Sequence, residues 1–436
     1  MAKTHSQYVC QQCGYAQVGW AGKCPNCETW GSLVETIIEK EREESRARKT
    51  RGGKKPVSLS SIPSRRIPRT STKISELDRV LGGGLVSGQV GLLAGEPGIG
   101  KSTLLLQLAD KLGDTLYVSG EESAHQLKLR ADRLKVTKKS IQIMEETDVD
   151  AIVAQIKEVK KISCVIIDSI QTTTTQDLSG LAGSVGQVRE CAFRLLSAAK
   201  GKNVPLFLVG HVTKEGVVAG PAVLAHIVDT VLWFEGDKTT ALRLLRAVKN
   251  RFGPTDEVGI FSMEDKGLIS MTDPEKMFLT KGVRNVAGSV VSSVMQGTRP
   301  IIVEIQSLVV PTKLAFPRRI AQGIDSKRLE LLIAVLARRC GLPLYEYDCF
   351  VNITSGIRVK DTGVDLAICL SLASAFFDKA LPNKLMAIGE VGLLGEIREV
   401  AVEARRLREA RRLGFNITMS QGNTKFLNQA IKKLLR

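Results

Sequence analysis

Nine consecutive residues, from Gly95 to Thr103, have the types and the spacing of a phosphate-binding loop. The segment reads Gly-Glu-Pro-Gly-Ile-Gly-Lys-Ser-Thr and fits the pattern G-x-x-x-x-G-K-[ST]. Glycines allow backbone N–H groups to turn towards a phosphate, and the N-terminus of a following helix adds partial positive charge. Lys101 is predicted to reach the β- and γ-phosphates, and the Ser102 hydroxyl to bind Mg²⁺. The predicted nucleotide-binding residues are Gly95, Glu96, Pro97, Gly98, Ile99, Gly100, Lys101, Ser102 and Thr103.

The segments on either side favour this interpretation over a chance match in a glycine-rich turn. The apolar run 89–94 before the loop predicts a buried strand, and residues 104–109 after it predict a helix. A phosphate-binding loop requires that order of strand, loop and helix. The sequence therefore predicts a site for a nucleoside triphosphate, with ATP and Mg²⁺ as the bound species.

Carboxylates at the ends of two further predicted strands would complete a hydrolytic site. Asp168 ends the apolar segment 164–168 and is predicted to hold the Mg²⁺ shell, directly or through water. Hydrolysis also needs a group that orients or deprotonates water. Glu121, after the predicted strand 115–119, is the first candidate and Glu122 the second; the alternative is that both acids only begin the next helix. His211 follows another predicted strand, as either a γ-phosphate sensor or a polar strand cap.

Four of the nine cysteines have the spacing of a closed zinc site. They form two C-x-x-C pairs, Cys10 with Cys13 and Cys24 with Cys27, and a pair of redox-active dithiols is the alternative. Four thiolates leave no open coordination position, so the predicted Zn²⁺ is structural and supplies folding energy to a segment too short for its own core. The remaining cysteines are predicted to be small core residues in a reducing cytosol: Cys164, Cys191, Cys340, Cys349 and Cys369.

Length and charge limit the class of protein further. A chain of 436 residues is too long for one ordinary core, so two or three domains are expected. The formal net charge is +17, of which residues 1–70 carry +7 and residues 400–436 another +7. Basic ends around a nearly neutral middle favour a polyanionic partner, although a solvated basic surface gives the same pattern. The absence of a long apolar stretch and of an apolar N-terminal segment predicts a cytoplasmic protein without a membrane partner.

Changes in pattern along the chain predict four parts. Residues 1–34 form the four-cysteine module, and residues 35–70 form a charged linker. Strand-like and helix-like segments alternate over 71–270, which predicts an α/β domain with a parallel sheet; strands at 230–234, 241–249 and 257–262 are expected to be hairpin additions at one edge. A second α/β region occupies 271–436 and includes a basic helix over 401–413 with Leu407 and Leu413 on its apolar side.

With these motifs in place, essentially the whole chain resembles the bacterial RadA (Sms) family of RecA-related DNA repair proteins. The resemblance rests on the four-cysteine module, the loop 95–103, the segment Lys-Asn-Arg-Phe-Gly at 249–253 and a tail similar to the Lon protease domain. It implies a RecA-like core and a role for Lys249 and Arg251 in catalysis. On a strand both side chains would point to one face, where they would stabilise transition-state charge across a subunit interface. A purely structural role at the strand end is the alternative.

The tail departs from Lon where the chemistry of that protease occurs. Lon uses a serine and a lysine, and the aligned positions here are placed at Val364 and Ala404. Without a nucleophile and its activating amine there is no acyl transfer, so the domain is expected to be inactive and to serve ring assembly and DNA contact. Candidate DNA-binding residues are Lys214, Lys249, Arg251, Arg318, Arg319, Lys327 and Arg328; a solvated basic face is the alternative.

The resemblance implies a DNA-dependent ATPase of recombinational repair. Such a protein would form a homo-hexameric ring, move on single-stranded and branched DNA, drive branch migration, and work with a recombinase. Two rival functions remain open: a nucleotide-switched scaffold ATPase that is indifferent to DNA, and an ATP-dependent protease, which would require the missing dyad.

Overall fold

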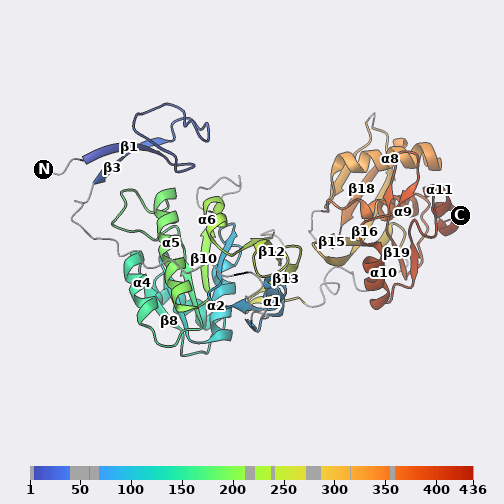
Figure 1. The fold of residues 1–436 in the computed structure, drawn as a ribbon. Helices are drawn as coiled ribbons and strands as arrows, with labels where there is room; N and C mark the ends of the chain where they lie inside the picture. The colour runs from blue at the N-terminus through green and yellow to red at the C-terminus, as the bar shows by residue number, and fades with distance from the viewer. Residues whose placement is uncertain are drawn as a thin grey trace. The chain divides into compact units, whose positions relative to one another are not determined.

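A nine-stranded sheet is the centre of the first of two units into which the chain divides. The computed structural model describes residues 4–39, 58, 68–211, 221–236, 241–271, 286–314, 316–353 and 359–435. The units span Met1–Met271 and Thr272–Arg436 (Figure 1). Within these described ranges, no helix combines the length and the apolar character needed to cross a bilayer.

Six parallel strands form the body of the sheet in the first unit. In spatial order they are β11 (Thr230–Glu235), β6 (Val90–Gly95), β10 (Leu206–His211), β9 (Cys164–Asp168), β7 (Thr115–Ser119) and β8 (Gln142–Glu145). At the β11 edge an antiparallel meander adds β12 (Leu242–Asn250), β13 (Val258–Glu264) and β14 (Gly267–Ser270). Most of the inner strands are buried along their whole length, as expected for a parallel sheet covered on both faces.

Helices cover both faces of this sheet and create two separate cores. On one face the core includes residues of α1 (Ser75–Leu81), α2 (Lys101–Leu112) and α3 (Ala124–Arg133). On the other it includes residues of α4 (Val149–Glu158), α5 (Val185–Lys202) and α6 (Pro221–Ile227). Adjacent residues of β6 show the division, because Leu93 packs into the first core and Leu92 into the second. The predicted α/β class with a parallel sheet is confirmed.

The predicted element boundaries agree closely with the structure, with one difference in pairing. The expected strands over 115–119 and 164–168 coincide with β7 and β9. The expected hairpin of β11 with β12 is present, with Thr230 opposite Asn250, but β11 also pairs in parallel with β6, with Thr230 opposite Gly91. A parallel neighbour requires a crossover connection, and the short helix α6 lies between β10 and β11. Beyond β11, the strands β12 to β14 continue the sheet as an antiparallel meander.

The second unit is a smaller α/β fold with its own sheet. Its strands lie in the order β17 (Arg319–Gln322), β18 (Tyr347–Ile353), β16 (Arg299–Pro311), β15 (Ser289–Gln296), β19 (Leu385–Ala387) and β22 (Ile417–Met419). The hairpin β20 (Glu390–Val391) and β21 (Ile397–Arg398) stands apart from it. The helices are α8 (Ser326–Cys340), α9 (Asp365–Phe376), α10 (Glu403–Arg412) and α11 (Leu427–Leu435). Leu407 and Leu413 pack against a buried cluster, as predicted.

Arg406 is an unexpected member of the interior of this second unit. It belongs to the basic helix α10 but is only 2% exposed. Its guanidinium donates to the carbonyl oxygens of Ser293 (2.7 Å) and Ala401 (3.1 Å), and it lies 2.7 Å from Asp361 Oδ2. The ion pair therefore joins α10, β15 and the segment before α9. The scattered cysteines also agree with expectation, since Cys164, Cys191, Cys349 and Cys369 are buried and Cys340 is half-buried.

We predict that Arg406→Met destabilises the second unit by about 3–5 kcal/mol, because it leaves the Asp361 carboxylate and two carbonyls without their buried cation. The exposed neighbour Arg405 on the same helix provides the matched control, Arg405→Met. Hydrogen–deuterium exchange of peptides from residues 286–435 measures the change. Equal protection in the two variants would contradict the structural role assigned to Arg406.

Candidate nucleotide site and metal centre

The loop between β6 and α2 has the backbone geometry that phosphate binding requires. Gly98 and Gly100 have φ angles of 76° and 115°, a region that side chains with a Cβ rarely adopt. A Cβ on Gly95 would lie 2.3 Å from the carbonyl oxygen of Phe234, and one on Gly100 would lie 2.6 Å from Cε of Met263. Glycine at these positions therefore lets the loop backbone turn tightly above the sheet, with α2 beginning at Lys101.

Lys101 lies almost entirely inside this loop, at 3% exposure. Its ammonium donates to the carbonyl oxygens of Gly95 and Glu96, both at 2.9 Å. Burial lowers the pKa of Lys101 to about 8, while the charges of Asp168 and Glu121 act in the opposite direction. An ammonium group has three N–H donors. Two of them bind the carbonyl oxygens of Gly95 and Glu96, so within the described part of the chain the third is left for a phosphate oxygen. The negative charge of a bound triphosphate would further stabilise the protonated form of Lys101.

Asp168 ends β9 at the same edge of the sheet and is 8% exposed. Its Oδ2 accepts a hydrogen bond of 2.6 Å from the hydroxyl of Tyr117, which lies on the neighbouring strand β7. Ser102 is half-buried in the first turn of α2. A carboxylate and a hydroxyl at this place are the hard oxygen ligands that Mg²⁺ takes, so the donor set fits that ion. Sequence reasoning missed Tyr117, because an aromatic residue inside an apolar strand is typical of a core.

The two candidate glutamates after β7 have different surroundings. Glu121 accepts a hydrogen bond from the Ser169 hydroxyl, and His211 Nε2 lies 3.4 Å from its Oε1, an ion-pair distance without hydrogen-bond geometry. His211 and Ser169 together hold the pKa of Glu121 at about 2, so this carboxylate is ionised throughout the neutral range. Glu122 instead pairs with Arg130 of α3 at 2.5 Å. The structure thus brings Glu121 near Lys101 and Asp168 and turns Glu122 towards a helix; their catalytic roles stay predictions.

His211, the last residue of β10, contacts this group from a third strand. Its carbonyl oxygen accepts a hydrogen bond of 3.2 Å from Gln171 Nε2, so the residue does close the strand end. Both ring nitrogens are buried and lack a hydrogen-bond partner among the described residues. The sensor and strand-cap interpretations therefore both remain open.

The Lys249–Gly253 segment lies at the end of the parallel strands opposite to the phosphate-binding loop. Thr230 pairs with Asn250 and with Gly91 near the start of β6, whereas the loop follows the end of β6 at Gly95. Lys249 donates to the carbonyl oxygens of Ala225 (2.7 Å) and Val228 (2.8 Å) at the end of α6, and Arg251 pairs with the buried Asp229 at 3.2 Å. β12 ends at Asn250, so the expectation that Arg251 shares the strand with Lys249 is wrong. Both side chains nevertheless reach the same connection between α6 and β11.

The other predicted DNA-binding residues divide into exposed and internally bonded side chains. Lys214 lies outside the described residues. Arg318 and Lys327 are exposed. Arg319 donates to the carbonyl oxygen of Leu344 at 2.8 Å, and Arg328 forms an ion pair with Asp365, which is 1% exposed. Within the described part of the chain, Arg318 and Lys327 are the exposed members of this set for which no internal ion pair is seen, and contact with DNA stays a prediction for all of them.

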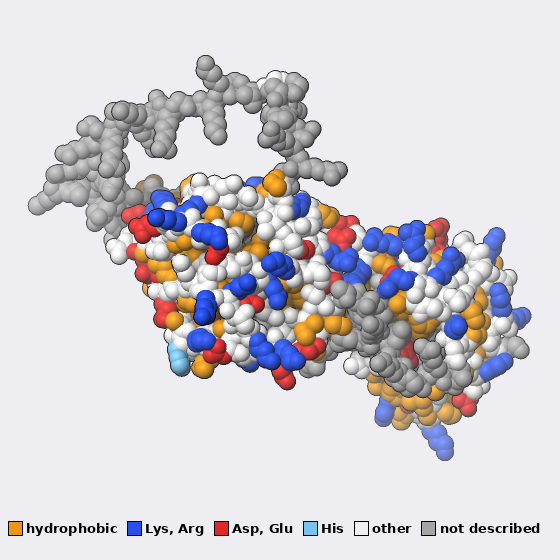
Figure 2. Space-filling model, turned by 90° about the horizontal axis from the view of Figure 1, so that it is seen from below, with side chains coloured by type: hydrophobic (Ala, Val, Ile, Leu, Met, Phe, Trp, Pro, Cys, Tyr) orange, Lys and Arg blue, Asp and Glu red, His pale blue; other side chains and the backbone are white. Residues whose placement is uncertain are grey.

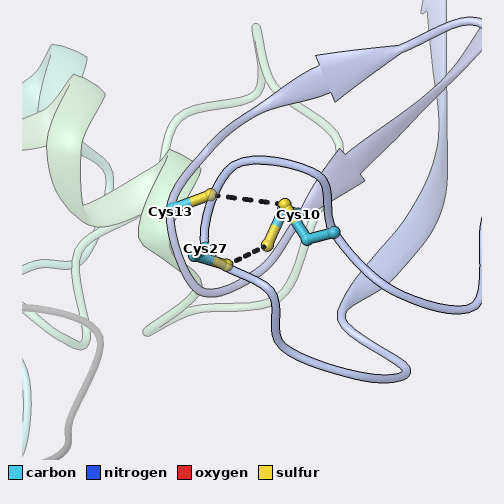
Figure 3. A group of neighbouring side chains, drawn as sticks. Cys10, Cys13 and Cys27 are labelled. Atoms are coloured by element: carbon cyan, nitrogen blue, oxygen red, sulfur yellow. Dashed lines mark hydrogen bonds between the residues drawn. The ribbon is translucent and has the colours of Figure 1, made fainter.

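Four cysteines converge in the N-terminal three-stranded sheet of β1 (Thr4–Cys10), β2 (Ala16–Gln17) and β3 (Leu33–Glu39). The sulfur of Cys10 lies 3.5 Å from that of Cys27, and the sulfur of Cys13 lies 3.7 Å from that of Cys24. All four sulfurs lie within 4.8 Å of one another (Figure 3 labels Cys10, Cys13 and Cys27). A tetrahedral zinc ion with bonds of about 2.3 Å requires sulfurs roughly 3.8 Å apart, so the set fits Zn²⁺.

Comparison with known proteins agrees with both sites. A family model described as an AAA domain matches residues 58–217, and one described as a rubredoxin metal binding domain matches residues 8–35. The DNA repair protein RadA of Bacillus subtilis is 47% identical over 422 residues, which cover 95% of this chain and 92% of that protein. Those of Halalkalibacterium halodurans and Listeria monocytogenes are each 46% identical, cover 95% of this chain, and are covered over 92% and 91% of their lengths.

The chain belongs to the RadA family of DNA repair proteins. The resemblance predicted from its motifs is therefore confirmed. RadA membership and the AAA domain support an ATPase, and that domain suggests ATP with Mg²⁺. The matched metal-binding model and the four converging sulfurs suggest Zn²⁺ for this RadA chain.

We predict that Cys24→Ser removes about one zinc ion per chain and unfolds the N-terminal sheet, because metal binding supplies most of the folding free energy of such a small module. Cys340→Ser is the control, since Cys340 lies outside the cluster and is half-buried. Zinc content by atomic emission and fluorescence of Trp20 and Trp30 measure the two effects. Full zinc content in Cys24→Ser would contradict the four-thiolate site.

We predict that Glu121→Gln lowers the rate of ATP hydrolysis at least 100-fold and changes nucleotide affinity only a few-fold, because it removes the ionised carboxylate that would orient water. The adjacent change Glu122→Gln is expected to leave the rate within a few-fold, since Glu122 faces Arg130. Steady-state hydrolysis and equilibrium binding of a fluorescent nucleotide test both variants. Equal losses in the two variants would refute the assignment.

Proposed function

We propose that this RadA chain is a DNA-dependent ATPase that acts as a motor on single-stranded and branched DNA in recombinational repair. The observation that supports it best is the meeting of Lys101, Asp168 and Glu121 at one edge of the sheet, beside a glycine-rich loop. The relatives named as DNA repair proteins support the part of the proposal that concerns action on DNA.

Each residue of the group has a separate task in the proposed reaction. The loop backbone and Lys101 bind the β- and γ-phosphates, and Lys101 offsets charge that develops between them. Ser102 and Asp168 would hold Mg²⁺, which supplies charge neutralisation on the phosphates when bound. Glu121 accepts a hydrogen bond from the attacking water and so orients it towards the γ-phosphate. Because the pKa of Glu121 is about 2, orientation fits this carboxylate better than proton abstraction.

We propose that hydrolysis takes place between subunits of a homo-hexameric ring. Lys249 and Arg251 lie at the far edge of the sheet from their own phosphate-binding loop, so a nucleotide that they contact would belong to a neighbouring subunit. The Lon-like region over 271–436 would assemble the ring. It would have no protease activity, since Val364 is buried and neither Val364 nor Ala404 carries a nucleophile or amine.

DNA would bind through its phosphate backbone, with Arg318 and Lys327 as exposed contacts. Lys and Arg side chains are spread over the face of each unit that Figure 2 presents, with fewer Asp and Glu side chains between them. Such a surface favours salt-sensitive binding that is largely independent of base sequence. A recombinase is the proposed protein partner, because branch migration continues the exchange that a recombinase begins.

Steady-state ATP hydrolysis with and without single-stranded DNA tests the proposed function, with Lys101→Ala as the blank. We expect several-fold stimulation by DNA, loss of that stimulation at high salt, and background activity in the blank. Arg318→Ala should weaken the stimulation and reduce the salt dependence, because one phosphate contact is lost. Hydrolysis that requires Lys101 but ignores DNA would refute the motor and favour the nucleotide-switched scaffold.

A further inference from the structure

One buried hydroxyl next to the nucleotide site has no place in the roles described so far. Tyr117 is fully buried in the middle of β7, where its ring packs into the core beneath α2. A phenylalanine at this position would pack into the core in the same way as the tyrosine ring. Its hydroxyl, however, donates the 2.6 Å hydrogen bond to Asp168 Oδ2. A hydroxyl in an apolar core needs such a partner, and here the partner is the carboxylate expected at the metal.

This hydrogen bond fixes which oxygen of Asp168 is available to a ligand. The terminal torsion of an aspartate is broad and close to two-fold, so the side chain does not orient its own carboxylate strongly. With Oδ2 bound to Tyr117, the carboxylate plane is set and Oδ1 is the oxygen left for a metal ion or its water.

Without the hydroxyl, Asp168 has a competing partner close by. The charge of Asp168 acts on the Lys101 ammonium, which is itself buried and short of water. A carboxylate freed from Tyr117 would gain by rotating towards that ammonium, since charge-assisted bonds are strong in a dry site. Such a rotation would turn towards Lys101 the oxygen needed for the metal.

We propose that Tyr117 is a positioning residue that holds the Asp168 carboxylate in the orientation that binds the nucleotide-associated Mg²⁺. The inference rests on the proposed nucleotide site. It assigns to the hydroxyl of Tyr117 a task that its aromatic ring, as a core residue, does not perform.

The test is Tyr117→Phe in the full chain, which keeps the ring and removes only the hydroxyl. Equilibrium binding of a fluorescent ADP analogue is measured in EDTA and then across a Mg²⁺ series. We expect affinity in EDTA to stay within two-fold of the wild type, while the Mg²⁺ concentration for half-maximal tightening rises about tenfold. Hydrolysis at limiting Mg²⁺ should fall and recover at high Mg²⁺. This rescue separates a positioning role from a general loss of structure.

Tyr347→Phe provides the matched control, because Tyr347 is a half-buried tyrosine of the second unit. It should leave the Mg²⁺ dependence unchanged. The proposal is overturned if Tyr117→Phe and the wild type need the same Mg²⁺, or if the variant loses affinity equally in EDTA and in Mg²⁺. In both cases a wild type that binds nucleotide with Mg²⁺ dependence keeps the proposed site intact. A wild type without that dependence would refute the site and the positioning role together.

Discussion

The nucleotide site depends on the burial of one positive charge, the ammonium of Lys101. An isolated ammonium is costly to remove from water, and the fall of its pKa to about 8 records that cost. The surrounding fold offsets it with the carbonyl oxygens of Gly95 and Glu96 and with two carboxylates, Asp168 at the end of β9 and Glu121 just after β7. The loop therefore needs glycines that can turn its carbonyls inward, and the sheet needs an order that places β9 and β7 on the same side of β6. The placement of residues that are far apart in the sequence is thus required by one desolvated charge, the ammonium of Lys101.

Three acidic side chains, Asp168, Glu121 and Glu122, lie at or just after the ends of β9 and β7, and each has a different partner. Asp168 accepts from Tyr117, Glu121 from Ser169 beside His211, and Glu122 pairs with Arg130. Carboxylates that shared one environment would compete for protons and for the same cation. Separate donors instead leave Asp168 facing the loop, keep Glu121 ionised, and commit Glu122 to α3. The chemistry of the site is in this sense decided by the neighbours of the acids as much as by the acids themselves.

Sequence reasoning succeeded where the relevant residues are consecutive and failed where the partner is distant. The glycines of the loop, the C-x-x-C pairs and the apolar strands β7 and β9 are local patterns, so spacing alone revealed them. The bond from Tyr117 to Asp168 depends on the pairing of two strands whose residues are 51 positions apart. Arg328 and Asp365 are 37 positions apart, and the partner explains why a cation predicted to be free is bonded internally. Arg406 was hidden for the same reason, in a helix whose other arginines are exposed.

The two cations of the Lys249–Gly253 segment differ in how easily each could leave its present partners. Thr230 of β11 pairs with Asn250 at the end of β12 and with Gly91 of β6. Gly91 lies four residues before Gly95, which is roughly 13 Å along the strand. Lys249 donates to carbonyl oxygens at the end of α6, so its departure would leave two partly buried acceptors without this donor. Arg251 is 53% exposed and shares Asp229 with Lys200, which lies 3.1 Å from the same oxygen. Asp229 would keep a cation if Arg251 swung outward. A phosphate presented by another subunit would therefore recruit Arg251 at a lower cost than Lys249.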